Sequence, residues 1–443
     1  MRIFTLASLA ALCLAATAGA QSVNMINNPG FEAGASKDGV PESWKAWTPR
    51  ENLNIKYSVD KKVFRSGKSS FCMQGNGNDN CIGGVMQEMQ NITAGKTYKF
   101  TGYFKVEGIK SVRENVVARI VWGEGDGMDY AVNQAAEGQW IRLEQVMTAK
   151  GSAAKATLRL EFRWTGTGKV WWDDLSLSET TPVKHRMVKI SSVHYRPRAM
   201  SEKAVIRQIF EKLDEAAKSK PDIVCLSECI FSPGSDKKTE KIVKQIPGPI
   251  TDQLGEKAKQ HNMYIVVGLE EQEKDTFYNC AVLIDRQGKV AGKYRKIHLP
   301  LSEIMAGYTP GDSYPVFNTD FGKIGILICW DNQFQETSRI LALNGAEIIF
   351  WPSWAGDEVV QRARAADNNV FMVSSVYDGK SMIVDPDGKV LAEAEKPAIM
   401  NVTVDLDREP TRVWLGAPGT GDWKNVWKKD RRPELYKKIS EPY

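Results

Sequence analysis

The chain has 443 residues, of which 42% are hydrophobic and 26% are charged, so it can bury sizeable cores, and its length indicates two or three domains. The net charge is +5, from 59 basic and 54 acidic residues whose signs are interspersed. Because there is no basic stripe and no block of like charge, the sequence argues against nucleic acid as a partner.

The first segment, "MRIFTLASLAALCLAATAGAQS", has one positive charge at Arg2, a short apolar stretch and a small-residue end. The tripeptide 18–20 fits an A-x-A cleavage site, which predicts a signal peptide over residues 1–20. An uncleaved anchor is the alternative, but the apolar stretch is short for a spanning helix. No later run is long and apolar enough to span a bilayer. We therefore expect a secreted or periplasmic protein with no membrane partner after cleavage.

Residues 21–178 have the pattern of an all-β domain. Short runs such as "KTYKFTGYFKV", "NVVARIVWG", "ATLRLEFRW" and "KVWWDDLSL" alternate apolar and polar residues, and clusters of Gly, Asn and Asp separate them. Several such strands at short spacing predict a β-sandwich or jelly roll.

Export leads to an oxidising compartment, where thiols tend to pair. Cys72 and Cys81 flank the loop "CMQGNGNDNC", and the sequence leaves open whether they form a local disulfide or stay free. Cys225 and Cys280 lie inside apolar, strand-like runs, which predicts buried and inert thiols.

Residues 179–186 are polar with one proline and read as a linker, and the pattern changes in residues 187–443. "MVKISSVHY" and "PDIVCLSE" read as strands. Between them "SEKAVIRQIFEKLDEAAKSK" has apolar residues at helical spacing, and Ser201 can cap it. Further strands, including "KIGILIC", alternate with helical pieces at about 335–345 and 358–368. This alternation predicts an α/β domain with helices packed outside the sheet.

Three reactive side chains follow strands of this second domain: Glu228 closes "IVCLSE", Lys296 closes "GKVAGKYRK" and Cys329 closes "IGILIC". Ligand sites in α/β folds favour the carboxyl ends of strands. A thiol attacks as the thiolate and needs a base, which a carboxylate in a dry pocket can be. A fixed ammonium can stabilise the oxyanion, with the backbone N–H of Trp330 as a second donor. The set predicts acyl transfer through a thioester.

Each of the three groups alone also has a purely structural interpretation. Glu228 could form an ion pair at the rim of the sheet, Lys296 could belong to a solvated basic face, and Cys329 could be a core thiol. A Cys–His pair is the rival arrangement, and His298 lies two residues after Lys296. The pattern does not require the histidine.

The order Glu228, Lys296, Cys329 resembles the nitrilase, or carbon–nitrogen hydrolase, superfamily. The supporting stretches run in the right order from residue 187 to about 440: "PDIVCLSE", "GKYRKIHLP", "YTPGDSYPVFNTDFGKIGILICWDNQFQE", "NGAEIIFWPS", "RARAADNNVFMVSS" and "RRPELYKK". The resemblance implies a four-layer α-β-β-α sandwich with Glu228 as general base, Lys296 as oxyanion stabiliser and Cys329 as nucleophile. It also implies no cofactor or metal for catalysis, and usually a homodimer.

The resemblance extends to a second carboxylate after the Lys segment, and Glu303 matches that place; an exposed loop acid is the alternative. Two close carboxylates would raise one pKa, as a base requires. Asp331 either binds substrate or orients its loop. Tyr278, Trp330 and Trp354 are candidates for the pocket wall, although aromatic residues are as often plain packing.

Within the superfamily, the pattern is most similar to amidases that cleave simple amides or N-carbamoyl groups. Gln335 departs from it, because a proline often precedes the family's glutamate there, and this puts the substrate class in doubt more than the chemistry. A true nitrilase and a non-catalytic glycan-binding protein are the alternatives.

The first domain, through "INNPGFEAG", "RSGKSSF" and "VWWDDLSL", resembles galactose-binding-like jelly rolls, including carbohydrate-binding modules. The resemblance implies carbohydrate as a partner and a structural Ca²⁺, for which Glu32 and Asp174 match by position; two solvated acids are the alternative. Trp47, Trp122 and Trp164 could stack on sugar rings, but a core position is expected for most of them.

Overall fold

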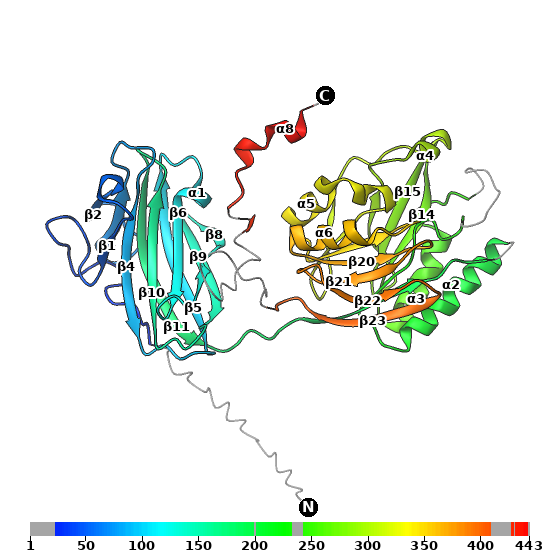
Figure 1. Cartoon of the computed structure of the whole chain (residues 1–443), viewed down its shortest axis with the longest axis horizontal. Helices are drawn as coiled ribbons and strands as arrows, with labels where there is room; N and C mark the ends of the chain where they lie inside the picture. The colour runs from blue at the N-terminus through cyan, green and yellow to red at the C-terminus, as the bar shows by residue number, and fades with distance from the viewer. Residues whose placement is uncertain (1–22, 199–200, 233–241, 409–426, 429, 442–443) are drawn as a thin grey trace, which may run out of the picture. The chain divides into compact units, whose positions relative to one another are not determined.

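The computed structural model describes residues 23–198, 201–232, 242–408, 427–428 and 430–441 (Figure 1). The predicted signal peptide and Gln21 lie outside these residues. The chain divides into two compact units with a boundary between Pro182 and Val183.

The first unit is a sandwich of two antiparallel sheets, which confirms the predicted β-sandwich. The five-stranded sheet has the order β1 (Lys45–Trp47), β4 (Ile82–Gln90), β10 (Lys155–Arg163), β6 (Val116–Trp122) and β7 (Gly127–Tyr130). The six-stranded sheet has the order β2 (Lys56–Asp60), β3 (Ser70–Gln74), β11 (Lys169–Thr180), β5 (Thr97–Glu107), β9 (Trp140–Thr148) and β8 (Asn133–Glu137). Two short helices, η1 (Glu51–Leu53) and α1 (Val112–Asn115), lie in its loops.

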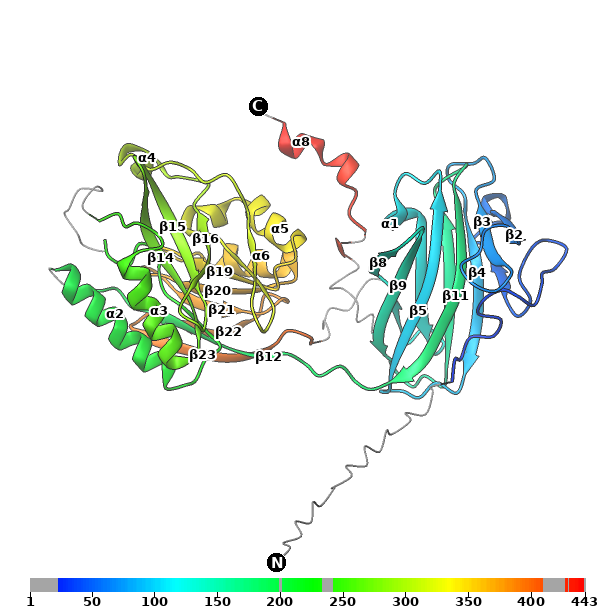
Figure 2. The same ribbon diagram turned by 180° about the vertical axis from the view of Figure 1, so that it is seen from behind.

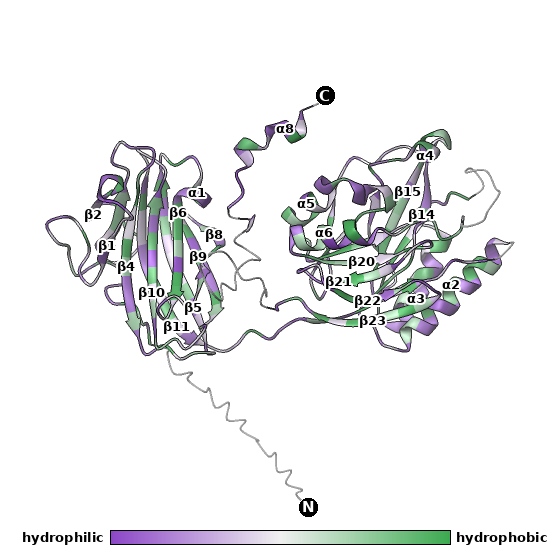
Figure 3. Ribbon diagram, viewed as in Figure 1, coloured by the Kyte–Doolittle hydropathy of each residue, from purple (hydrophilic) through white to green (hydrophobic). Residues whose placement is uncertain are grey.

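Alternation along the strands places the core of this unit between the two sheets, and Figure 3 shows the alternating hydropathy along β4, β10 and β6. On β10 the residues that face the core are Leu158, Leu160 and Phe162, all fully buried. Trp122 is also fully buried in this core, so its indole is a packing group and not a sugar platform.

Cys72 and Cys81 both have free thiols. Cys81 belongs to the core between the sheets, whereas Cys72 packs with Trp140 and Trp171 in a separate cluster. Phe71 and Met73, which flank Cys72 on β3, are core residues, so the strand pleat turns Cys72 to the outer face. The local disulfide that the sequence left open is therefore not formed.

The second unit contains two six-stranded sheets. One has the order β16 (Val290–Arg295), β15 (Thr276–Ile284), β14 (Tyr264–Glu273), β13 (Ile223–Cys225), β12 (Met187–His194) and β23 (Ala398–Asp405). The other has the order β17 (Val316–Asn318), β18 (Lys323–Ile326), β19 (Ile348–Pro352), β20 (Phe371–Ser375), β21 (Ser381–Val384) and β22 (Val390–Ala394). Figures 1 and 2 show α2 and α3 together on one side of these sheets and α5 and α6 on the other.

This arrangement is the predicted four-layer α-β-β-α sandwich. Its central core lies between the sheets, and strands such as β13, β19, β20 and β21 are fully buried runs, as expected where both faces are covered. The covering helices are α2 (Glu202–Ala217), α3 (Pro249–His261), α5 (Gln335–Leu343) and α6 (Glu358–Asn368), close to the predicted ranges. The shorter helices are α4 (Leu301–Met305), η3 (Cys329–Gln333), η4 (Pro433–Leu435) and α8 (Lys437–Ser440).

Helix α2 illustrates how the sequence specifies the outer layer. The Ser201 hydroxyl accepts a hydrogen bond from the Ala204 N–H, which caps the first turn. Its buried residues, at spacings of three or four, are Val205, Ile209, Leu213 and Ala216. In the part of the chain that the structure describes, no helix is both long and apolar enough to cross a membrane.

Candidate active site

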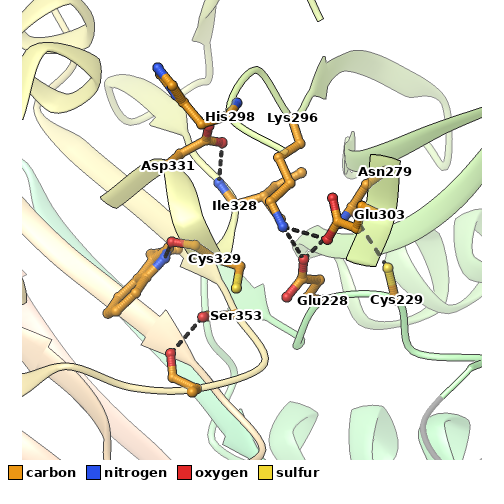
Figure 4. Close-up of polar contacts among 12 residues, drawn as sticks. Glu228, Cys229, Asn279, Lys296, His298, Glu303, Ile328, Cys329, Asp331 and Ser353 are labelled. Carbon is orange, nitrogen blue, oxygen red and sulfur yellow. Dashed lines mark hydrogen bonds and ion pairs between the residues drawn. The ribbon is translucent and has the colours of Figure 1, made fainter. Parts of the chain in front are cut away.

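The three predicted reactive groups come together where strands of both sheets end (Figure 4). Glu228 follows β13 by three residues, Lys296 directly follows β16, and Cys329 follows β18 by three residues and begins η3. The first two strands belong to one sheet and β18 to the other, so the site lies where the two sheets face each other.

Lys296 is fully buried between two carboxylates. Its Nζ donates to Glu228 Oε1 at 3.0 Å and to Glu303 Oε1 at 2.6 Å. Burial alone would lower the pKa of the Lys296 ammonium, but the charges of Glu228 and Glu303 raise the pKa above its usual value. Lys296 therefore holds a fixed positive charge in a dry site, as an oxyanion stabiliser requires.

Each of the two carboxylates keeps one oxygen without a hydrogen-bond partner among the described residues. These atoms are Glu228 Oε2 and Glu303 Oε2, and both are buried. Burial, more than the nearby charge of Glu228, raises the pKa of Glu303, although Lys296 opposes the shift. Two free carboxyl oxygens beside one ammonium can accept hydrogen bonds from a substrate N–H or take up a proton.

Asn279 joins the two carboxylates, and the sequence analysis missed it. Its Nδ2 donates to Glu228 Oε1 at 2.7 Å and to Glu303 Oε1 at 3.0 Å, and its Oδ1 accepts from the Cys229 thiol at 3.5 Å. Asn279 is 2% exposed on β15. The available signal was a lone amide in the otherwise apolar run "YNCAVLID", because a buried amide needs hydrogen-bond partners.

Cys329 occupies a constrained turn. Its backbone φ is +44°, a left-handed conformation that a residue with a Cβ rarely adopts, and the Trp351 indole N–H holds the Cys329 carbonyl at 3.0 Å. Figure 4 shows the sulfur facing the side of the site where Glu228 and the Lys296 ammonium lie. The backbone N–H of Trp330, in the first turn of η3, has no intrahelical partner available.

The thiol of Cys329 is protonated at neutral pH. Burial, then the charge of Glu228, raises the pKa of Cys329 to about 11, while Lys296 and the Trp354 backbone N–H oppose this. A protonated thiol next to an unoccupied carboxylate oxygen is the arrangement in which a base must remove the proton as the sulfur attacks.

Asp331 is fully buried, and its carboxylate has a structural set of partners. Oδ1 accepts from the backbone N–H of His298 at 2.9 Å and lies 3.0 Å from His298 Nδ1, while Oδ2 accepts from the Tyr294 hydroxyl at 2.8 Å and from the Ile328 N–H at 3.0 Å. Asp331 thus ties the turn of Cys329 to the segment after Lys296. Of the two interpretations that the sequence left open, the structure supports the orienting one. His298 serves the same contact and is not paired with the thiol.

The three aromatic candidates have different positions. Trp354 is half-buried and reaches the site through its backbone N–H, which lowers the pKa of the Cys329 thiol. Trp330 is 46% exposed and packs edge-on against Phe334. Tyr278 does not join the site, because neighbouring residues on a strand point to opposite faces and the adjacent Asn279 points inward.

Glu270 is a further buried carboxyl next to this site that the sequence analysis missed. It pairs in register with Asn279 on the inward face of the sheet and is 1% exposed, and the side chains of Ser232 and Cys229 beside it only partly oppose the effect of burial on its pKa. Burial raises the pKa of Glu270 to about 7. Its anionic form is therefore costly in the folded state.

Replacing Glu270 with Gln is expected to stabilise the chain at pH 8 and to change little at pH 4. In the unfolded chain Glu270 loses its proton near pH 4.5, but in the folded chain only near pH 7, so the folded state binds more protons in between. Stability therefore falls as pH rises from 4.5 to 7, by about 3 kcal/mol for this group. Denaturant unfolding across pH 4–8 measures this loss of stability, and Glu211→Gln, at an exposed position, is the control. If the wild type and Glu270→Gln showed the same dependence of stability on pH, the raised pKa of Glu270 would be contradicted.

The predicted calcium pair Glu32 and Asp174 does not fit a shared cation site. Asp174 Oδ2 lies 2.6 Å from a guanidinium nitrogen of Arg65, which takes the place of a bound cation. Glu32 Oε1 accepts instead from the backbone N–H groups of Lys68 and Ser69, at 2.9 and 3.2 Å. No cluster of three potential metal ligands of the His, Cys, Asp or Glu type occurs within the described ranges. Glu32 and Asp174 therefore do not form the calcium site that the resemblance implied.

Comparison with known proteins places this geometry in context. Residues 189–414, about half of the chain, match the carbon–nitrogen hydrolase family, and residues 23–167 match a carbohydrate binding domain. An omega-amidase of Homo sapiens is 33% identical over 221 residues, which cover 44% of this chain and 80% of the relative.

Two other similar proteins are covered by this chain over almost their whole length. A nitrilase of Pyrococcus abyssi is 32% identical over 272 residues, or 56% of this chain and 99% of the relative. The crystal structure of a carbon–nitrogen hydrolase from Helicobacter pylori superposes with a TM-score of 0.51 at 25% identity, covering 58% of this chain and 99% of that chain.

Proposed function

Because the chain belongs to the carbon–nitrogen hydrolase family, we propose that its second unit is a thiol amidase that hydrolyses linear carboxamides or N-carbamoyl compounds through a thioester on Cys329. The observation that carries the proposal is the unoccupied, buried Glu228 Oε2 beside the fixed ammonium of Lys296 and the protonated thiol of Cys329. Together these are a base, an oxyanion stabiliser and a nucleophile.

The proposed reaction follows from this geometry. The substrate carbonyl lies toward the Lys296 ammonium and the Trp330 N–H, and its amide N–H groups donate to the free oxygens of Glu228 and Glu303. Cys329 attacks as Glu228 takes the thiol proton, and the negative charge forms on the substrate oxygen beside Lys296. Glu228 returns the proton to the leaving nitrogen, and ammonia departs as the thioester forms.

Hydrolysis of the thioester uses the same groups in the second half of the cycle. Glu228 removes a proton from water, the hydroxide adds to the thioester carbonyl, and the Cys329 thiolate leaves and recovers a proton. The sum is an amide plus water giving an acid plus ammonia. For an N-carbamoyl substrate, the carbamic acid then releases carbon dioxide and the free amine.

The substrate class is tested by measuring ammonia release from a panel of carboxamides, N-carbamoyl amines and nitriles. We expect turnover of a carboxamide or carbamoyl compound at kcat/KM of at least about 10³ M⁻¹s⁻¹, and no turnover of nitriles. Turnover of nitriles alone would establish the alternative nitrilase, since similar proteins of both names exist. No turnover of any member would favour the glycan-binding alternative.

Carbohydrate binding by the first unit is a second candidate function. It is supported by the match of residues 23–167 to a carbohydrate binding domain and by two tryptophans outside the core: Trp47 is half-buried and Trp164 is 44% exposed. An indole face that solvent can reach offers a surface on which sugar rings stack.

Two properties of the whole protein belong to the same proposal. Residues 1–20 would direct export, so the mature protein should begin at Gln21, and intact-mass measurement of protein from the native host checks this. An uncleaved N-terminus in the mass measurement would refute the signal peptide.

A homodimer is proposed from the family resemblance, and exposed apolar residues on the α5 and α6 layer, Leu343 and Val359, support it. Light scattering should then give twice the chain mass, and a monomer mass would refute the homodimer.

A further inference from the structure

The outer face of the five-stranded sheet in the first unit carries an unusual set of charges. Along β10 the even-numbered residues 156–162 face the core, so Arg159 and Glu161 face outward. The strand register places Arg159 between Met86 of β4 and Arg119 of β6, and Glu161 between Gly84 and Val117. Trp47 of β1 pairs with Gly84, so Trp47 lies in line with Glu161 across the neighbouring strands of the sheet.

One carboxylate on this face is shared by the neighbouring arginines. Glu161 is 2% exposed, and its Oε1 lies 2.5 Å from a terminal guanidinium nitrogen of Arg119. Its Oε2 lies 3.8 Å from Arg163 Nη1. The next acidic residue on the outer face of β4, Glu88, is paired with Lys155. Glu161 therefore balances Arg119 and, weakly, Arg163.

Arg159 has no ion-pair partner among the described residues of the chain. Its Nε is buried and lacks a hydrogen-bond partner, and its guanidinium lies 5.2 Å from the ring of Trp47. Burial, followed by the repulsion of Arg119, lowers the pKa of Arg159, which shows that the positive charge is held there at a cost. The charge of Glu161 opposes this shift, but Glu161 is already paired with Arg119, so a half-buried cation beside a second cation still favours a further anion.

Aromatic groups accompany the arginines on this side of the sandwich. Trp47 lies beside Arg159, and Trp164, at the end of β10, has the guanidinium of Arg163 4.5 Å from its ring. An indole fits the apolar face of a sugar ring, and a guanidinium fits a carboxylate or sulfate through two parallel hydrogen bonds. The two groups side by side match a sugar that carries a negative charge.

We propose that the outer face of the sheet formed by β1, β4, β10, β6 and β7 binds an acidic carbohydrate, with Arg159 pairing with its carboxylate or sulfate and Trp47 packing against its ring. The inference rests on the proposed carbohydrate function of the first unit and specifies its ligand class. The hydroxyl groups of a neutral glycan could accept hydrogen bonds from Arg159 but would leave its charge without a counterion, so an anionic sugar is the better match.

The test is calorimetric titration of the mature full-length chain with three probes: oligogalacturonides, which carry carboxylates, heparin-derived oligosaccharides, which carry sulfates, and neutral xylo-oligosaccharides. We expect one of the acidic probes to bind at least about tenfold more tightly than the neutral probe, and the identity of that probe distinguishes carboxylate from sulfate. Arg159→Gln should weaken the acidic interaction at least about tenfold.

The matched control is Arg142→Gln, which removes the same charge from the other sheet, where Arg142 already pairs with Glu137 and Glu144. It should leave affinity within about twofold, and this separates a specific site from general attraction to a basic protein. If Arg159→Gln does not fold, Arg159→Lys is the second variant. It keeps the positive charge but loses the planar guanidinium that makes two parallel hydrogen bonds, so it should still weaken binding. Equal loss in both variants, or tighter binding of the neutral probe, would overturn the acidic ligand and leave carbohydrate binding intact. Silence toward all three probes would overturn both.

Discussion

Replacing Cys329 with Ala is expected to lower the rate of amide hydrolysis by at least about 10⁴-fold while leaving the melting temperature within a few degrees of the wild type. The loss is large because the proposed route has no other nucleophile: without the sulfur no thioester forms, and Glu228 and Lys296 remain with nothing to activate. The fold should persist because the side chain is only partly buried and its turn is held by Asp331 and by the Trp351 indole. Ammonia release and thermal unfolding, measured on the same preparation, check both halves of the expectation.

The neighbouring thiol Cys229 is the control for this experiment. It lies in the same site, but burial raises its pKa well above the usual value and its thiol donates to Asn279 Oδ1, so it is held as a neutral donor. Cys229→Ala should keep turnover within about tenfold of the wild type, as expected for loss of one weak hydrogen bond. An incubation of the wild type with a slow amide should leave an acyl group on Cys329 by mass spectrometry. Full activity in Cys329→Ala, or an acyl group on Cys229, would contradict the assignment.

The sequence predicts the fold well where local patterns and burial agree. Alternating runs gave β5, β6, β10 and β11, and helical spacing after Ser201 gave α2. The fully buried strands of the second unit, such as "KIGILIC", read as apolar runs because helices cover one face of each sheet and the second sheet covers the other. The approximate ends of the strands could be located from the sequence, and Glu228, Lys296 and Cys329 follow the ends of β13, β16 and β18.

The contacts within the site could not be predicted in the same way, because they depend on side-chain direction and on register between strands. Tyr278 and Asn279 are adjacent in the sequence, and only the pleat decides which one enters the site. The sequence left Asp331 either as a substrate ligand or as a residue that orients its loop, and only its four short contacts to the Cys329 turn and the His298 segment favour the second role.

The same limit applies to the first unit. Asp174 has the residue type and position of a calcium ligand, but Arg65, more than a hundred residues earlier, lies against it. Arg159 reads as one more surface charge in an alternating strand. That it forms no ion pair within the described part of the chain depends on three neighbouring strands, and no local pattern reports it.

Replacing Glu228 with Gln is expected to lower kcat by about 10³-fold and to change how Cys329 responds to pH. Glutamine can still accept from Lys296 and Asn279 through its amide oxygen, so the geometry should persist while the base is lost. With the pKa of Cys329 near 11 in the wild type, only a small fraction of the sulfur is thiolate at pH 7, and attack depends on transfer of the proton to Glu228. In Glu228→Gln that transfer is absent, so alkylation of Cys329 by iodoacetamide should be slow at pH 7 and rise about tenfold per pH unit.

The pH at which this rise levels off distinguishes the base from a merely structural carboxylate. The charge of Glu228 is one of the causes that raise the pKa of Cys329, so its removal should bring the plateau below pH 11. Glu303→Gln is the matched control: it removes the other carboxylate from Lys296, but Glu303 is not among the leading causes of the Cys329 pKa shift, so the pH profile of alkylation should stay close to that of the wild type. If the two variants gave the same profile, the carboxylates would act only by holding Lys296, and the proton would have to leave Cys329 by another route.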